Sequence, residues 1–136
     1  MNDLIEAYKN SKYKVFEPDI IIEIGVLNQD VDGLLIEYKS VEWAFITAYN
    51  PYSRVLTNDE NRLRHEDLKE LTKAYITFEG HGAGEDPAWE PELSLFIIGI
   101  SKEEASLIGK RFEQNAIVFG KTNSEPELLI LNDTSN

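Results

Sequence analysis

Polar side chains that could bind a ligand gather in one short turn. Asn50-Pro51-Tyr52-Ser53 comes directly after an apolar run, and a turn at the end of a buried strand is a common place for ligand contacts. The same residue types also form turns without any ligand, because Asn, Pro and Ser favour turn geometry. Asn50 and Ser53 are therefore candidates for hydrogen bonding to a ligand, and a purely structural turn is the alternative.

Arg64 is the candidate for binding an anion. In the helix predicted to start at Thr57, helical spacing puts Arg64 toward the apolar side and Asn61 one turn earlier, at the edge of that side. A charge there must be paired, must reach solvent or must line a cavity. Pairing with a carboxylate at the rim of the core is the structural alternative to ligand binding. The apolar stripe is expected at Leu63, Leu68 and Leu71, opposite a solvated face of Asn58, Arg62, His65 and Lys69.

The most conspicuous loop is Gly80–Trp89, whose three alternate glycines would let backbone amides approach a ligand. It is not a phosphate-binding loop, because no Gly-Lys-Ser/Thr follows. Nor is it a dinucleotide fingerprint, because the spacing is wrong and two prolines prevent the helix that should begin there. His81 is a candidate general acid or base. Only one histidine is local, so we expect no metal site.

No arrangement of nucleophile, base and acid can be recognised in the sequence. The chain has no cysteine, its serines lie in no elbow-type motif, and two histidines leave little choice of base. Glu92 precedes an apolar strand and is a second candidate for proton transfer, with a solvated carboxylate at a strand edge as the alternative. Whether the protein is an enzyme stays open, and no residue pattern predicts a cofactor.

The elements that must position these residues are those of an α+β domain. Thr57 to Glu60 and Ser101 to Glu104 are capping boxes, which begin helices. The run VEWAFITAY is apolar on both alternating faces, which is typical of a central strand covered on both sides. Adjacent strand pairs late in the chain favour a largely antiparallel sheet of five to six strands with three to four helices. Helices are expected near 4–8, 30–38, 57–73 and 101–114, and strands near 19–27, 41–49, 74–79, 93–100, 116–120 and 127–131.

Composition limits the partners. The 136 residues predict one domain over 1–131 and a short polar tail over 132–136. The formal net charge of −12 argues against nucleic acid and anionic membranes, which both attract basic faces. The acidic residues either keep the protein in solution or steer it to a basic protein partner. Because the chain lacks cysteine and a signal peptide, we expect a cytoplasmic location.

Several short motifs occur in a recognisable order between residues 36 and 119. They are Ala44–Ala48 followed by Asn50-Pro51 and Ser53, Glu60-Asn61 with Arg64, the glycine loop leading to Trp89 and Glu92, and the run FEQNAI over 112–117. Their order and spacing resemble the domain-of-unknown-function family numbered 3293, from uncharacterised bacterial proteins. The sequence departs from that pattern at Glu113, where a small residue is expected, and fits it only loosely at Pro91–Ser94.

The resemblance implies no activity, but the matching positions are disproportionately polar. They are Thr47, Asn50, Ser53, Asn61, Arg64, Glu92, Gln114 and Asn115. A pattern that served packing alone should be mostly apolar, so we expect these residues to form a shared polar pocket or an internal hydrogen-bond network. The leading hypothesis is a domain that binds a small polar or anionic ligand. The alternative is an acidic protein-interaction module, such as an inhibitor, immunity or regulatory protein, and a third reading gives the polar residues to the fold alone.

Overall fold

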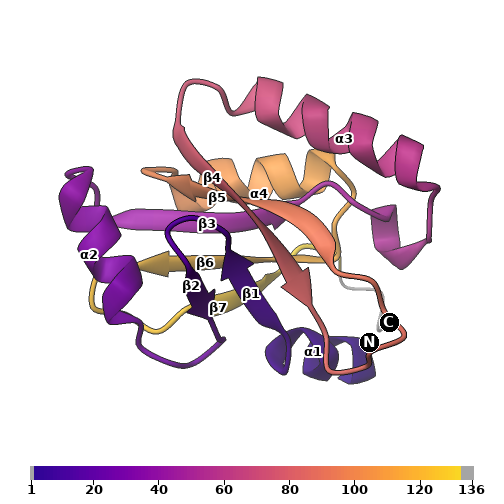
Figure 1. Cartoon of the computed structure of the whole chain (residues 1–136), viewed down its shortest axis with the longest axis horizontal. Helices are drawn as coiled ribbons and strands as arrows, with labels where there is room; N and C mark the ends of the chain where they lie inside the picture. Colours follow the sequence, from indigo (N-terminus) through magenta and orange to yellow (C-terminus); the bar gives the residue numbers. More distant parts are fainter. Residues whose placement is uncertain (1, 133–136) are drawn as a thin grey trace.

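The sheet is built around the most apolar segments of the chain. A computed structural model describes residues 2–132, in which seven antiparallel strands form one sheet in the order β2-β1-β4-β5-β3-β6-β7 (Figure 1). The middle strand is β5 (Glu92–Ile98), which lies between β4 (Ile76–Ala83) and β3 (Glu42–Thr47). The outer strands are β1 (Lys12–Val15), β2 (Ile20–Ile22), β6 (Ala116–Lys121) and β7 (Glu127–Ile130).

Helices cover both faces of this sheet. The described residues form α1 (Asn2–Lys9), α2 (Gln29–Glu37), α3 (Asn58–Leu71), α4 (Lys102–Arg111) and a single turn of 3-10 helix, η1 (Pro51–Ser53). Helices α3 and α4 lie together on one side of the sheet, and α1 lies at one end, next to β1 (Figure 1). In the described part of the chain, no helix is both long and apolar enough to cross a membrane.

Alternation along β3 divides the core into two layers. Trp43 and Phe45 pack with α2 on one face, whereas Ala44 and Ile46 pack with α3 and α4 on the other. Successive side chains of a strand point to opposite faces, so α2 buries one face of β3 and α3 with α4 bury the other, while β5 and β6 pair with its two edges. The α+β class, the antiparallel pairing and the central position of this strand are as the sequence predicts.

The sheet curls so that its two edge strands approach each other. The backbone N–H of Gly25, just after β2, donates to the carbonyl oxygen of Pro126, just before β7, over 2.9 Å. Unpaired edge strands invite association with other chains, and short edges limit that risk. Here both edges are short, at three residues in β2 and four in β7.

The sheet has seven strands, not the five to six expected. The missed strand is β1, whose sequence KYKV alternates charged and apolar residues over only four positions. That pattern is too short to stand out in the sequence, although Tyr13 and Val15 are buried as a strand would bury them. The strand expected over 19–27 is also shorter, at Ile20–Ile22.

Capping residues start α2, α3 and α4, and α3 and α4 begin where the sequence predicts. Thr57 and Glu60 form a complete capping box at the start of α3, and the Ser101 hydroxyl accepts from the Glu104 amide at the start of α4. Asn28 caps α2, because its side-chain oxygen accepts from the Val31 amide over 3.0 Å.

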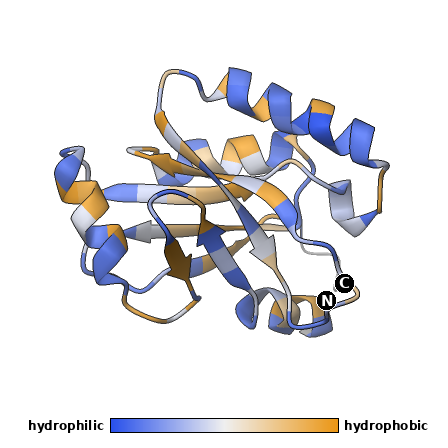
Figure 2. Ribbon diagram, in the orientation of Figure 1, coloured by the Kyte–Doolittle hydropathy of each residue, from blue (hydrophilic) through white to orange (hydrophobic). Residues whose placement is uncertain are grey.

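The predicted apolar face of α3 is wrong at Leu63 and Leu71 and confirmed at Leu68. Leu63 is 69% exposed and Leu71 is 41% exposed, whereas the face turned to the sheet carries Asn61, His65 and Leu68. Figure 2 shows α3 as largely hydrophilic along its length. Two polar side chains on the buried face can be accommodated only if hydrogen bonds replace water, so this helix is held by polar contacts as well as by packing.

The expected glycine loop is partly strand. Gly80, His81 and Gly82 belong to β4, which pairs with both β1 and β5. A side chain at Gly80 would overlap the backbone carbonyl of Lys14 in β1, so this glycine lets two strands approach closely. The loop proper begins at Gly84, and strand packing accounts for the glycine at position 80.

Candidate functional site

A strained turn stands where β3 ends and β5 begins. Asn50, Tyr52 and Ser53 all have left-handed backbone conformations, with φ of 49°, 50° and 63°. Such angles are uncommon outside glycine and persist only where surrounding contacts impose them. One such contact joins the Tyr52 amide to the carbonyl oxygen of Glu113 over 2.7 Å.

Asn50 is the centre of a hydrogen-bond network. Its side-chain oxygen accepts from Asn61 Nδ2 at 2.9 Å and from the Leu56 amide at 3.0 Å. Its backbone amide donates to Asn61 Oδ1 at 2.9 Å, and its Nδ2 donates to Glu92 Oε2 at 2.8 Å. Both polar atoms of the Asn50 side chain are therefore used, and the network ties the turn to both α3 and β5.

Arg64 joins elements through backbone carbonyls. Its Nε donates to the carbonyl oxygen of Ala48 at 2.6 Å, and a terminal nitrogen donates to the carbonyl oxygen of Phe112. The other terminal nitrogen lies 3.7 Å from a Glu113 carboxylate oxygen. The guanidinium thus ties the end of β3 to the end of α4, and its charge is directed to the protein itself. Arg64 is therefore neither free to bind an anion nor paired only with carboxylates.

Gln114 and Asn115, in the segment between α4 and β6, complete the network. Gln114 Nε2 donates to the carbonyl oxygens of Tyr49 and Phe112, at 3.0 and 3.1 Å. Asn115 Nδ2 donates to Ser53 Oγ at 2.9 Å, and its oxygen accepts from Asn132 Nδ2 at 3.0 Å. Asn132, the first residue of the expected tail, is therefore in contact with the network, and the rest of that tail lies outside the described residues.

Glu92 and Tyr8 bring titratable groups to this network. Burial raises the pKa of the Glu92 carboxyl, and the hydrogen bond from Asn50 opposes that rise. Burial likewise raises the pKa of Tyr8; hydrogen bonding to Ser53 and Asn115 opposes the rise, and the charge of Glu92 adds to it. Both side chains are half-buried, whereas Ser53 is exposed. The three groups form the outward-facing side of the network.

The structure brings the predicted polar residues together around one end of the sheet. Of the candidates from the sequence, Asn50, Ser53, Asn61, Arg64, Glu92, Gln114 and Asn115 share this network through hydrogen bonds and short chain connections. Thr47 lies beside it, with its hydroxyl donating to the carbonyl oxygen of Leu93 at 2.7 Å. Tyr8 and Asn132 are the members that the sequence did not reveal. In the sequence, Tyr8 fits the pattern of an apolar helix position, and Asn132 belongs to the expected polar tail.

His81 does not belong to this cluster. In the β4–β5 register His81 is opposite Leu93, whereas Glu92 is opposite Gly82. Neighbouring residues of a strand point to opposite faces, so His81 and Glu92 lie on different faces of the sheet. The His81 ring packs edge-on against Phe16 with centroids 5.1 Å apart, and burial lowers its pKa, with a smaller contribution from the Lys14 charge. A shared proton-transfer step between these two residues is excluded by this geometry.

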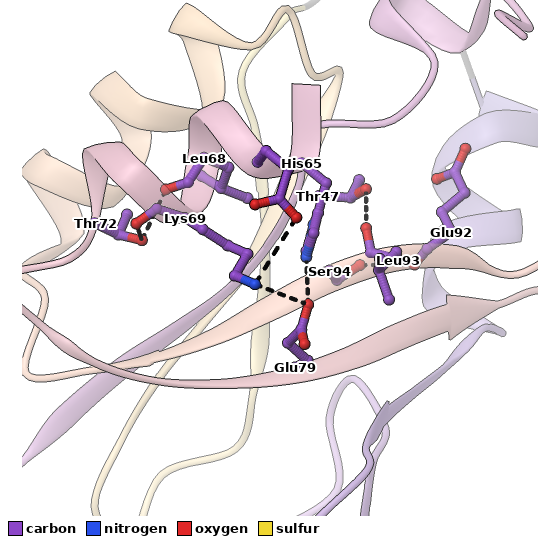
Figure 3. A network of polar contacts seen from close by, with 10 residues as sticks. Thr47, His65, Leu68, Lys69, Thr72, Glu79, Glu92, Leu93 and Ser94 are labelled. Carbon is purple, nitrogen blue, oxygen red and sulfur yellow. Dashed lines mark hydrogen bonds and ion pairs between the residues drawn. The ribbon is translucent and has the colours of Figure 1, made fainter. Parts of the chain in front are cut away.

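A second polar network involves the histidine that the sequence placed in solvent. His65 is only 2% exposed, and its Nε2 lies 2.7 Å from Glu79 Oε1, which Lys69 also approaches at 3.9 Å (Figure 3). An ionised carboxylate only accepts, so Nε2 donates this hydrogen bond. The Nδ1 atom of the same ring is buried without a hydrogen-bond partner among the described residues. Figure 3 also shows Thr47, whose hydroxyl donates to the carbonyl oxygen of Leu93.

The two networks hold few groups suited to a metal. Within residues 2–132, no set of three or more His, Asp or Glu side chains is gathered as a metal site would need. The outward-facing groups around Asn50 are a carboxylate, a phenol and a hydroxyl. These can accept and donate hydrogen bonds, and the carboxylate can attract a positive charge.

Comparison with known proteins identifies a family and nothing more. The model of the family described as Protein of unknown function (DUF3293) matches residues 46–117, which is more than half of the chain. The match includes the end of β3, all of η1, α3, β4, β5 and α4, and therefore most of the polar network. Neither the curated proteins nor the solved structures gave a significant match. The chain belongs to the DUF3293 family of proteins of unknown function.

Proposed function

We propose that this domain binds a small polar ligand at the outward-facing side of the Asn50 network, through Glu92, Tyr8 and Ser53. The observation that carries the proposal is the half-buried Glu92 carboxylate, held by Asn50 through one oxygen and next to a half-buried tyrosine. Its other oxygen, Oε1, accepts no hydrogen bond from a described residue. This oxygen is not among the buried unpartnered atoms, so a ligand or water can reach it and donate a hydrogen bond.

The same geometry favours a ligand that donates hydrogen bonds or carries positive charge. Arg64 uses its nitrogens on Ala48, Phe112 and Glu113, so its charge is not directed to an anionic group from outside. A ligand with an amine, amide or hydroxyl group suits Glu92 better than a phosphate does. The anionic ligand expected from the position of Arg64 alone is therefore not part of this proposal.

The network divides into groups that would touch the ligand and groups that would position them. Ser53, Tyr8 and Glu92 reach the surface, whereas Asn61, Gln114 and Asn115 are at most 7% exposed. The buried amides hold the strained turn and fix the Ser53 hydroxyl from behind. A rigid second layer of this kind is what keeps a binding group in one geometry.

Thermal-shift screening of the purified protein tests the proposal. The compounds are amines, amides, polyols and nucleosides, with inorganic phosphate and nucleotides as the anionic comparison. A ligand raises the melting midpoint by mass action, and we expect Glu92→Gln to weaken the apparent affinity by about tenfold. Glu90→Gln is the matched control, since Glu90 is exposed in the loop just before β5. Compounds that bind Glu92→Gln as well as the parent, or an absence of any ligand of the donor class, would contradict the proposal.

A second function, protein interaction through the acidic surface, is favoured by the distribution of charge. Every described Asp and Glu side chain is at least partly exposed, and the chain has a net charge of −12. Such a surface attracts basic partners at rates that fall as salt rises. Affinity capture at low and high salt, with the partners identified by mass spectrometry, tests this alternative. Recovery of a basic protein only at low salt is the expected result, and recovery of none would count against it.

A further inference from the structure

Helices α3 and α4 leave an apolar groove uncovered on the side away from the sheet. The groove has a volume of about 480 Å³, and its apolar lining consists of Leu71, Tyr75, Leu107 and Ile108. Leu107 is 61% exposed at the middle of α4, and Leu71 is 41% exposed at the end of α3. An exposed leucine alone needs no explanation, but two on facing helices around one groove form a patch that association would cover.

Charged residues at the two ends of the groove have opposite signs. Glu104 lines it near the start of α4, and Lys110 and Arg111 line it at the end. None of the three makes an ion pair with a residue in 2–132. Acids at a helix start and bases at its end suit the helix dipole. The dipole does not explain why an exposed leucine stands between them.

This pattern is complementary to itself when a second α4 helix packs antiparallel to the first. A twofold axis between residues 107 and 108 would bring Glu104 of one copy to Arg111 of the other, twice, and would place Leu107 against the apolar groove of the other copy. We propose that the α3–α4 groove is the interface of a symmetric homodimer. Twofold symmetry gives the commonest form of homo-oligomer, and it requires a self-complementary surface of this kind.

A second copy also fits the charge of the chain. Two proteins that each carry −12 repel each other across most of their surfaces, so a stable contact needs a locally balanced patch. The groove supplies one carboxylate and two cations per copy. Since salt weakens the local ion pairs and the general repulsion alike, salt dependence alone is a poor test, and exchange of charges is a better one.

Sedimentation equilibrium on the purified protein tests the dimer directly. We expect the parent chain to show a monomer–dimer equilibrium at micromolar to millimolar concentration. Leu107→Asp should raise the dissociation constant at least about tenfold, because it puts two like charges beside the twofold axis. Leu63→Asp is the matched control, because Leu63 is 69% exposed on α3 and does not line the groove, and it should leave the dimer unchanged. A parent chain that is monomeric throughout, or a Leu107→Asp dimer as tight as the parent, would overturn the proposal.

Charge exchange between copies gives the sharper result. Glu104→Arg and Arg111→Glu should each weaken self-association about tenfold or more, because like charges then meet across the axis. Mixed together, the two variants should form a heterodimer, because opposite charges again face each other at both contacts. At one contact the two substituted positions meet, and at the other the native Arg111 of the first variant meets the native Glu104 of the second. Circular dichroism melts check that both variants are folded. If both variants are folded monomers and their mixture also stays monomeric, the twofold arrangement is wrong.

Discussion

Asn50 and Asn61 hold each other through two hydrogen bonds, although eleven positions separate them in the chain. Asn61 Oδ1 accepts from the Asn50 backbone amide and Asn61 Nδ2 donates to Asn50 Oδ1, both at 2.9 Å. The pair fixes a left-handed residue at the end of β3 to the first turns of α3. Because Asn50 also donates to Glu92, this pair positions the carboxylate on which the proposed ligand site depends.

Asn61→Ala should therefore be strongly destabilising. The substitution removes the partner of the Asn50 amide, and one partner of its side-chain oxygen, in a site where Asn61 is only 4% exposed. Unsatisfied buried polar groups predict a loss of about 2–4 kcal/mol in the free energy of unfolding. Urea denaturation measures this loss. Asn58→Ala, on the exposed side of the same helix, should change the stability by less than about 0.5 kcal/mol, and equal effects of the two variants would contradict the account.

Arg64→Lys should show that the shape of the guanidinium matters more than its charge. A lysine keeps the charge but cannot donate to Ala48 and Phe112 at once in the geometry of the arginine. We expect a loss of about 1–3 kcal/mol in the free energy of unfolding. The exposed Arg62→Lys is the control and should be nearly neutral. An Arg64→Lys protein as stable as the parent would mean that the two carbonyl contacts contribute little.

Two glycine substitutions should act in opposite directions. Gly80→Ala places a methyl group against the Lys14 carbonyl and should cost about 2 kcal/mol or more, because neither strand can move aside cheaply. Gly33→Ala, in α2 with no neighbour within 4 Å of the added carbon, should stabilise the protein by about 0.5–1 kcal/mol. Thermal or urea denaturation of both variants decides. A tolerated Gly80→Ala would mean that the β1–β4 approach is not as close as described.

Glu92 should make stability fall as pH rises through the weakly acidic range. Its pKa is raised in the native protein, so the folded chain holds this proton more tightly than the unfolded chain does. The native state is therefore favoured below the ordinary carboxyl pKa and loses that advantage as pH rises through the raised value. Glu92→Gln removes the titrating group, so it should be more stable than the parent near neutral pH and equal to it in acid.

Melting midpoints of the parent and Glu92→Gln from about pH 4 to about pH 8 measure this difference. Glu90→Gln is the control and should follow the parent at every pH, because Glu90 is exposed and its carboxylate stays in water on folding. Parallel curves for the parent and Glu92→Gln would contradict the burial of the carboxylate.

The sequence predicts much of the fold because local signals are strong there. Capping residues at Thr57 and Ser101 mark two helix starts, and the two-sided apolar run of β3 marks a central strand. The prediction fails on α3, because hydrophobic periodicity assumes that the buried face is apolar. Here the buried face carries Asn61 and His65, whose partners come from the turn after β3 and from β4. No local sequence pattern predicts such distant hydrogen-bond partners.

The candidate site is predicted in its members but not in its arrangement. The polar residues of the family motifs do meet at one end of the sheet. Their division into buried amides and surface groups, however, depends on distances that only the fold sets. Tyr8 joins the cluster because α1 packs at that end of the sheet, and a single tyrosine in a short helix gives no sign of this. The contacts of Arg64 with backbone carbonyls could not be predicted either, because those carbonyls belong to segments distant in the sequence, which only the fold brings together.

The measurement that tests the proposed ligand site most directly is an NMR titration of the isotope-labelled protein with the best compound of the donor class. We expect amide shifts to change at Tyr8, Ser53, Glu92 and Asn115, and the same titration of Glu92→Gln to need about tenfold more compound for the same changes. Shifts confined to the α3–α4 groove, or identical titrations of the parent and Glu92→Gln, would contradict a ligand site at the Asn50 network.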